Sequence, residues 1–202
     1  MEGLMFYWIS WSFWVYLTFI LKKDNPYRLK IAAMILIVII LASVHFNISR
    51  FDVNFSGLFL LFYSYTSLYG KKIKTVLYFF ISSFIISIAY VTFHLFEMFD
   101  PIWLIFKKEW MMGICIGYLT VLLQKTLKGR LLVTISGTMQ GEILYSFILN
   151  KYDFPYQIGS FAYLDTWSLT ISLIVGWCCI EYAGVYLENY FKVMEEKKQR
   201  SS

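Results

Sequence analysis

Seven long apolar runs, separated by short polar gaps, decide what this chain can fold into. The three prolines, Pro26, Pro101 and Pro155, all lie in the gaps, where the loss of a backbone donor does not interrupt a helix. The runs cover about residues 3–21, 30–46, 53–69, 75–96, 110–124, 131–149 and 164–186. Because a helix needs about 20 apolar residues to cross a bilayer, we predict an all-α, polytopic membrane helix bundle of about seven transmembrane helices.

The composition agrees with this prediction. Of the 202 residues, 59% are hydrophobic and 15% are charged, whereas an ordinary soluble domain has roughly 45–50% and about 25%. A soluble fold of this size could not hide so much apolar surface. We therefore expect a single transmembrane helical domain over residues 1–190, with the lipid bilayer as its surroundings.

The basic residues predict an orientation, because cytoplasmic loops of membrane proteins collect Lys and Arg. With seven spans and the N-terminus outside, the outer gaps hold Arg50, Lys107, Lys108 and Lys151. The fourteen other basic residues then lie on the cytoplasmic side: Lys22, Lys23, Arg28, Lys30, Lys71, Lys72, Lys74, Lys125, Lys128, Arg130, Lys192, Lys197, Lys198 and Arg200. We therefore predict an N-terminus outside and a C-terminus in the cytoplasm.

Two regions need separate predictions. The fifth run, residues 110–124, is short and gives only about 22 Å of helix. We keep it as a span, because without it the basic cluster from Lys125 to Arg130 would move outside. Residues 191–202 are predicted to form a charged cytoplasmic tail, either a soluble helix end or disordered, that tolerates truncation.

Polar residues interrupt the middle of the sixth run. This stretch contains Ser136, Gly137, Thr138, Gln140, Gly141 and Glu142. Gly137 and Gly141 form a GxxxG pattern, which lets a second helix approach closely. Thr138, Glu142 and Ser146 recur every four residues and so share one helix face. Since an ionised carboxylate in the hydrocarbon is costly, we expect Glu142 to face the bundle interior, either protonated or paired.

The fourth run carries a matching stripe. Its polar residues follow the helical period at intervals of four, three, four and three: Ser83, Ser87, Tyr90, His94 and Glu97. We expect the cost of burying Glu142 to be offset by hydrogen bonds from Thr138, Ser146, Ser87 or Tyr90, or by bound protons or cations. The two stripes would then form a polar seam between mid-membrane and the outer surface. Hydrogen bonds that hold the helices together and a proton, ion or substrate path are both compatible with it.

Motifs for metal, cofactor or enzyme chemistry are not evident. The cysteines Cys115, Cys178 and Cys179 have no CxxC spacing, and His94 with Glu97 is more typical of a hydrogen-bonded pair than of a metal site. Nucleotide-binding and hydrolase signatures are missing as well. The net charge of +5 is concentrated in loops next to the membrane, where it sets topology and contacts anionic lipid rather than nucleic acid. We expect no metal, no cofactor and no enzyme activity.

Three stretches resemble one family. The opening MEGLMFYWISW, the basic turn after the first run and the SGTMQGE segment of the sixth are similar to the YphA-type membrane proteins of spore-forming bacilli. The similarity extends over most of the chain. It implies a small multi-pass protein of the bacterial cytoplasmic membrane, and it implies no site residues.

Three functional hypotheses follow. A structural or assembly protein that binds another membrane protein is favoured by the GxxxG groove and by the lack of convergent catalytic groups. A small transporter or channel is indicated by Glu142 and the polar seam, although no internal repeat supports it. An intramembrane enzyme would need a nucleophile and base, or a metal triad, that we do not find.

Overall fold

The computed structural model describes residues 2–48 and 51–200, and the basic residue Arg50 lies outside this part. The described residues are mostly helical, as predicted. The α-helices are α1 (Leu4–Val15), α2 (Arg28–Leu41), α3 (Phe55–Thr66), α4 (Ile73–Phe99), α5 (Lys108–Leu123), α6 (Leu127–Asn150) and α7 (Phe161–Arg200). A π-helical turn, η1 (Tyr16–Ile20), continues α1, and a 3₁₀ turn, η2 (Pro101–Trp103), follows α4.

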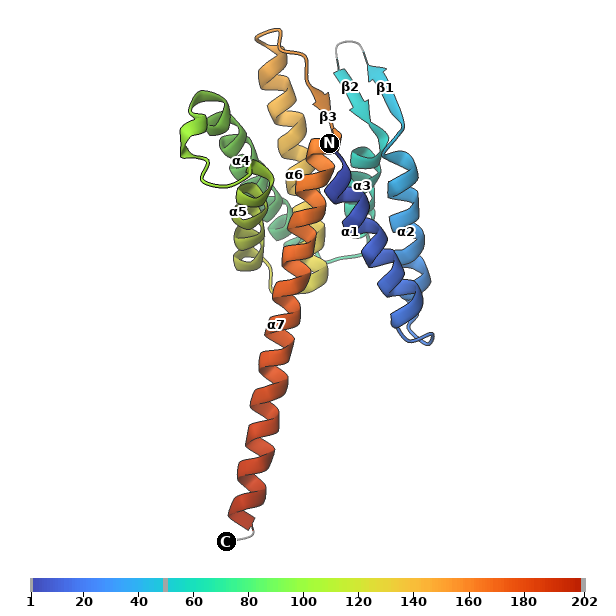
Figure 1. The fold of residues 1–202 in the computed structure, drawn as a ribbon, viewed down its shortest axis with the longest axis vertical. Coiled ribbons are helices and arrows are strands. Elements are labelled where there is room, and N and C mark those ends of the chain that lie inside the picture. Colours follow the sequence, from blue (N-terminus) through green and yellow to red (C-terminus); the bar gives the residue numbers. More distant parts are fainter. Residues whose placement is uncertain (1, 49–50, 201–202) are drawn as a thin grey trace.

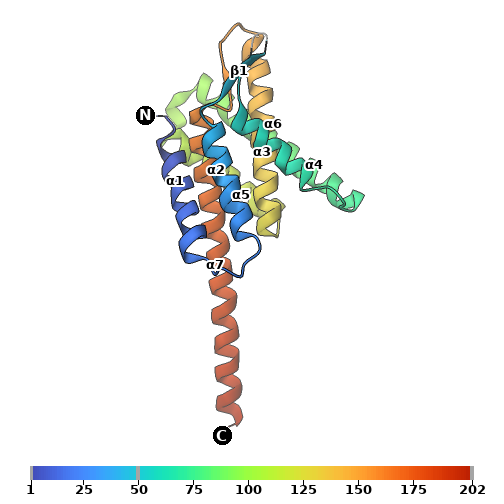
Figure 2. The same cartoon turned by 90° about the vertical axis from the view of Figure 1, so that its right-hand side faces the viewer.

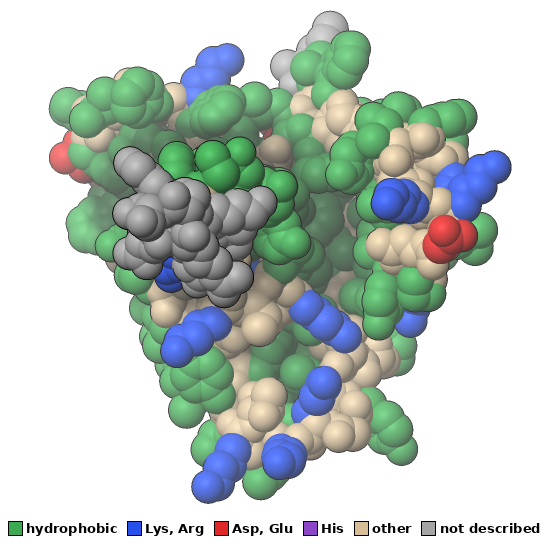
Figure 3. Space-filling view, turned by 90° about the horizontal axis from the view of Figure 1, so that it is seen from below, with side chains coloured by type: hydrophobic (Ala, Val, Ile, Leu, Met, Phe, Trp, Pro, Cys, Tyr) green, Lys and Arg blue, Asp and Glu red, His purple; other side chains and the backbone are tan. Residues whose placement is uncertain are grey.

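The helices run between two ends of one bundle (Figures 1 and 2). The N-terminus lies near the end that also holds the β-strands, which we call the sheet end. The turns at the other end carry the clusters Lys22–Lys23, Lys71–Lys72 and Lys125–Lys128, and we call it the basic end. Figure 3 shows Lys and Arg side chains across this face. Helix α7 continues well past the basic end without a neighbour (Figures 1 and 2).

A small sheet, which the sequence did not predict, covers one end of the bundle. Its strands are β1 (His45–Ile48), β2 (Phe51–Asn54) and β3 (Gln157–Ile158). Strand β2 pairs with β1 in antiparallel register and with β3 in parallel register. The prediction that helices extend to Phe46 and start again at Val53 is therefore wrong.

The physical reason for the sheet is the side chain of Asn54. It is completely buried, accepts a hydrogen bond from the Ser56 amide at 2.8 Å and donates one to the Ala42 carbonyl at 2.8 Å. The first bond caps the start of α3, and the second fixes the chain just after the end of α2. Both helices consequently stop short of the loop, and the residues between them pair as strands.

Helix lengths vary more than the apolar runs do. Three helical segments are long and apolar enough to cross a membrane: Ile73–Phe99, Leu127–Asn150 and Phe161–Lys192. Leu4–Ile20 and Phe55–Thr66 are shorter apolar helices, and α3 with its 12 residues reaches only about 18 Å. Seven complete crossings therefore remain a prediction, although a helix lies in each of the seven runs.

Helices α4 and α6 are in close contact. A Cβ atom added to Gly137 would lie 2.6 Å from Ile86 Cβ and 2.8 Å from the backbone oxygen of Ser83. One added to Gly141 would lie 2.9 Å from Tyr90 Cβ. The GxxxG groove thus holds α4 of the same chain, where the sequence had suggested a separate partner.

Polar side-chain contacts stabilise both ends of the bundled part of α7, and neither contact was predicted from the sequence. At the sheet end, the Asp165 carboxylate accepts hydrogen bonds from the amides of Gly3 and Phe6, both at 2.7 Å, and so caps α1. At the basic end, the buried Arg130 guanidinium of α6 forms an ion pair with Glu181 at 2.7 Å. These two contacts fix the position of α7 along its axis relative to α1 and α6.

Candidate functional site

Glu142 is the buried acid around which the candidate site is built. Its side chain is 0% exposed, and its carboxylate accepts hydrogen bonds from Tyr90 Oη at 2.5 Å, Tyr156 Oη at 3.0 Å and the Gly159 amide at 3.3 Å. Tyr90 reaches it because Gly141 lets α4 approach α6. All three partners can donate, so the buried oxygen atoms are satisfied without a counter-ion.

Only part of the predicted hydrogen-bond set reaches Glu142. Among the described residues, Tyr90 is the one expected donor that bonds it. Thr138 instead donates to the Thr134 carbonyl at 2.8 Å and contacts Tyr163 Oη at 3.1 Å. Ser146 Oγ is buried without a partner in the described chain, and Ser87 is buried in α4.

Tyr156 and Gly159 were missed by the sequence analysis. They belong to the connection between α6 and α7, which has no helical period that could align them with Glu142. The one local signal is Pro155, which marks the turn before Tyr156. Burial, followed by the nearby Glu142 carboxylate, raises the pKa of Tyr156 above its usual value. This tyrosine therefore stays a neutral hydrogen-bond donor.

A cavity of about 410 Å³ lies beside this carboxylate at the sheet end. Helices α4, α5, α6 and α7 and the α6–α7 connection all contribute to its walls. Its lining includes Glu2, Tyr90, His94, Glu97, Lys108, Met112, Tyr145, Tyr156, Ser160, Tyr163 and Thr166. Glu142 lies directly behind Tyr90 and Tyr156, to which it is hydrogen-bonded.

Aromatic rings form most of this wall. His94 stacks on Tyr145 with ring centroids 4.9 Å apart and meets Tyr90 edge-on at 4.7 Å. Tyr145 contacts Tyr156 at 5.1 Å, and Tyr90 contacts Tyr163 at 6.4 Å. The contacts are mostly edge-to-face, a favourable geometry for ring pairs, and they hold the four tyrosines around one space.

The charged rim of the cavity comes from α4 and α5. Glu97 pairs with His94 Nδ1 at 3.3 Å and with Lys108 Nζ at 3.2 Å. In the neutral ring, the bond to Glu97 assigns the proton to Nδ1 and leaves Nε2 as an acceptor. Nε2 is buried and has no partner among the described side chains, so one acceptor beside the cavity is unused.

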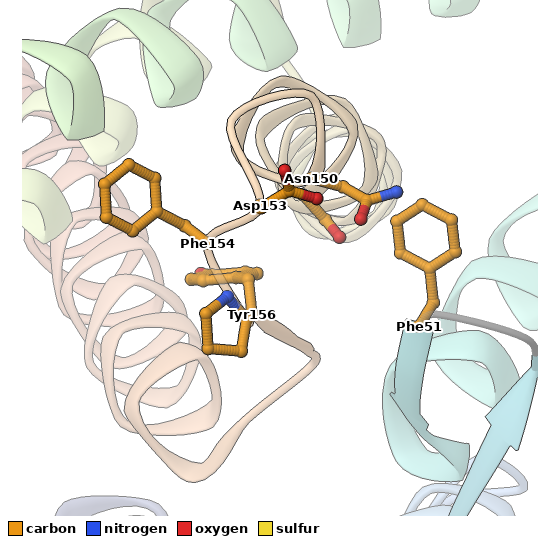
Figure 4. Close-up of a pocket in the computed structure, with 7 residues that line it drawn as sticks. Phe51, Asn150, Asp153, Phe154 and Tyr156 are labelled. Atoms are coloured by element: carbon orange, nitrogen blue, oxygen red, sulfur yellow. The ribbon is translucent and has the colours of Figure 1, made fainter.

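A smaller cavity of about 140 Å³ lies on the other side of Tyr156. Figure 4 shows Asn150 and Asp153 at the end of α6, with Phe51 facing them from β2. The unpartnered hydroxyl of Ser146 belongs to this lining. Tyr156 lines both cavities. Glu142 is one helical turn from Ser146, which lines the smaller cavity. Tyr156 and Glu142 therefore lie between the two cavities.

A buried polar stripe continues from Glu142 toward the basic end. It is formed by side chains at intervals of four on α6: Arg130, Thr134, Thr138, Glu142 and Ser146. Thr134 contacts Thr120 of α5 at 3.1 Å, and Arg130 closes the stripe through Glu181. Only the last three members were predicted from the sequence, because Arg130 lies in the predicted loop before the sixth run and Thr134 at the start of that run.

Gln140 is not part of this stripe. It points to a different side of α6 and donates hydrogen bonds to Tyr65 Oη at 2.8 Å and to Ser83 Oγ at 3.1 Å. It also contacts Ser136 one turn earlier. Gln140 therefore connects α6 with α3 and α4, and it does not contribute to the cavity.

Among the side chains that the structure describes, no group of three or more His, Cys, Asp or Glu could hold a metal ion. The three cysteines are free.

Comparison with known proteins gives two matches and one negative result. Residues 2–200 match the family model described as YphA-like integral membrane protein. The uncharacterised protein YphA of Bacillus subtilis strain 168 is 31% identical over 177 residues, which cover 87% of each chain. No solved structure matches. The resemblance found in the sequence is thereby confirmed.

Proposed function

We propose that this chain, which belongs to the YphA-like integral membrane protein family, binds a small organic cation in the larger cavity and transports it. The observation that carries this proposal is the position of Glu142. A buried carboxylate lies behind a wall of tyrosine rings, beside a space of about 410 Å³. Burying an acid in a membrane helix is costly; three hydrogen-bond donors offset part of this cost, and a bound cation would offset more of it.

The lining suits a cation better than an anion or an apolar molecule. Glu2 is at the cavity and Glu142 is behind it, while Glu97 and the one lysine of the lining, Lys108, pair with each other. Aromatic rings attract cations through their faces, and aromatic cages recognise organic ammonium groups.

The polar stripe of α6 supports transport rather than binding alone. From Ser146 to Arg130 it covers 16 residue steps, or about 24 Å at 1.5 Å per residue, which is most of the hydrocarbon thickness. Its members are all buried. A cation or proton that leaves Glu142 would therefore meet hydroxyl groups, and not only hydrocarbon, on its way to the basic end.

Binding is tested with choline as the probe and its neutral isostere 3,3-dimethylbutanol as the control. Choline should raise the melting temperature of the purified protein in detergent, because ligand binding stabilises the folded state. The alcohol should not. Equal shifts with both compounds, or no shift with choline and other organic ammonium salts, would contradict the proposal.

Glu142→Gln separates transport from a purely structural role. The amide keeps the shape and most hydrogen bonds of the carboxyl group, so expression and melting temperature should stay close to those of the parent. If Glu142 carries a proton or cation, choline binding and uptake into proteoliposomes should be lost. Wild-type uptake by this variant would assign Glu142 to helix packing alone.

We also propose a seven-span topology in the bacterial cytoplasmic membrane, with the sheet end outside. The basic clusters at the opposite end support this orientation (Figure 3). In a background without the native cysteines, a cysteine at Lys151 should react with an impermeant label on intact cells. Cysteines at Lys72 and Lys128 should react only after lysis. Labelling at position 128 from outside would show that the fifth run, residues 110–124, does not cross the membrane.

A second candidate function is membrane-protein assembly. The GxxxG groove no longer favours it, because α4 fills that groove. The exposed apolar face of α7 beyond the basic end now supports it, since Leu187 and Phe191 are more than half exposed there. We propose no enzyme activity, since the sequence carries no nucleotide-binding, hydrolase or metal-ligand signature.

A further inference from the structure

The projecting part of α7 exposes an apolar surface that the cation proposal does not explain. The ion pair between Arg130 and Glu181 fixes the point at which α7 leaves the bundle. From residue 182 to residue 194 the helix extends about 20 Å further at 1.5 Å per residue. Both views show this length without a neighbouring element (Figures 1 and 2).

Apolar residues follow a heptad pattern from the end of the bundled part of α7 into this segment. Gly176, Ile180, Ala183, Leu187, Tyr190 and Met194 are separated by four, three, four, three and four residues, and all six are exposed. The alternation of three and four is the spacing of the a and d positions in a coiled coil. It places Ile180, Leu187 and Met194 at a and Gly176, Ala183 and Tyr190 at d.

We propose that a second copy of this chain packs against this heptad face, so that the two α7 helices form a parallel coiled coil. The membrane dictates the orientation, because two copies inserted in the same sense have parallel α7 helices. A twofold axis along the membrane normal then brings the same face of each helix together. The inference rests on the assembly proposal and is independent of cation binding.

Lipid does not account for the whole of this face. Its part from Leu187 to Met194 lies beyond the proposed seventh span, residues 164–186, and the opposite side of the helix there is polar, with an exposed ion pair between Lys192 and Glu188 at 2.7 Å. In the proposed topology this part of the helix leaves the hydrocarbon with one polar and one apolar side, and a second protein surface would cover the apolar side.

The available area fits a stable dimer. Trp177, Tyr186, Tyr190 and Phe191 lie on or beside the heptad face and are 50–67% exposed. Since a buried aromatic side chain covers about 150–250 Å², their exposed parts offer roughly 300–600 Å² per copy. With Ile180, Leu187 and Met194 the face approaches the roughly 800 Å² per partner of a standard interface.

The small residues near the bundle make close approach feasible. A Cβ atom added to Gly176 would meet no other atom within 4 Å in the chain, and Ala183 is exposed one heptad later. Small residues at positions facing a second helix let the two backbones come close. The two bundles would therefore not hold the α7 helices apart where the coiled coil begins.

Disulfide crosslinking tests the pairing in membranes that contain the full chain without its native cysteines. Ala183→Cys, at a d position, should form a disulfide-linked dimer on mild oxidation. Val185→Cys is the matched control, because it is also exposed but lies about half a turn away on the opposite side of the helix. It should remain monomeric. Equal crosslinking of both variants, or crosslinking of neither, would overturn the proposal.

A double charge substitution gives the second measurement. Leu187→Glu combined with Met194→Glu puts like charges at two a positions and should convert dimers to monomers in single-molecule photobleaching of vesicle-reconstituted protein. The parent should bleach in two steps. The choline-induced melting shift should be unchanged, which keeps this result separate from the cation proposal. Two-step bleaching by the double variant, or one-step bleaching by the parent, would contradict a coiled-coil dimer.

Discussion

Helices α6 and α7 reverse the rule that polar residues lie outside and apolar residues inside. The most apolar window of α6 is 67% buried, whereas that of α7 is 22% buried. Yet α6 carries the acid, the threonines and the GxxxG stretch, and it packs against α3, α4, α5 and α7. In a bilayer the apolar surface needs no cover, and the polar groups do. Position in the bundle therefore follows from the need for hydrogen-bond partners.

The difference also separates the roles of the two helices. Helix α6 is surrounded, so a change in one of its side chains disturbs several neighbours. Helix α7 has two parts. The bundled part is fixed by Asp165 and Glu181, and the projecting part touches nothing else in the described chain. Substitutions should accordingly have large effects on α6, intermediate effects at the basic end and small effects on the tail.

The largest effect is expected for Glu142→Leu. It would leave Tyr90 Oη, Tyr156 Oη and the Gly159 amide without their shared acceptor, and an unsatisfied buried group costs about 1–3 kcal/mol. We expect a loss of stability of about 3 kcal/mol or more, seen as a fall in Tm in detergent. Parental stability and uptake in this variant would mean that the side chain does not face the bundle interior.

The second prediction concerns the α4–α6 contact. Gly137→Ala places a methyl group 2.6 Å from Ile86 Cβ, and such overpacking typically costs about 1–3 kcal/mol. Gly184→Ala is the matched control, because nothing lies within 4 Å of its added Cβ. It should leave Tm unchanged or raise it slightly, since alanine favours a helix over glycine. Similar Tm values for both variants would show that α4 and α6 are not in close contact.

The third prediction compares two ion pairs on α7. Glu181→Gln removes the acid that pairs with the buried Arg130, so an uncompensated guanidinium remains and Tm should fall measurably. Glu188→Gln removes the acid of an exposed pair with Lys192 and should have no detectable effect, because water and salt screen such pairs. Equal effects in thermal unfolding would mean that α6 and α7 separate at the basic end.

The smallest effect is expected for removal of residues 195–202. The heptad face ends at Met194, so membrane expression, Tm and disulfide crosslinking at position 183 should all match those of the parent. Immunoblotting of membranes and the crosslinking assay check this. Loss of membrane expression would contradict the prediction that the tail tolerates truncation.

Several features of the site were readable from the sequence because they depend on helical period alone. The spacing of Thr138, Glu142 and Ser146, and of Ser87, Tyr90, His94 and Glu97, aligns them on two helix faces before any contact is known. The pair of Tyr90 with Glu142 and that of His94 with Glu97 come from these two stripes. Tyr156 and Gly159 could not be found in this way, because a loop has no period.

The fold shows the same division. Apolar runs and prolines determined where helices lie and that the chain belongs in a membrane, because both depend on local composition and on the length of a span. The sheet at one end depends on the side chain of Asn54, which bonds the Ala42 carbonyl just after α2 and the Ser56 amide in α3. The sequence could not predict it, since it depends on where two helix ends meet in space.

The sequence by itself determined that this protein lies in a lipid bilayer, where its helices are, and that burying Glu142 among apolar residues has a free-energy cost. Only the tertiary structure decided which surface each helix presents to another. It filled the GxxxG groove with α4, gathered four tyrosines from α4, α6, α7 and a connecting loop around one cavity, and left the far half of α7 uncovered. Period and composition act within one helix, whereas these outcomes depend on shape complementarity between helices distant in the chain.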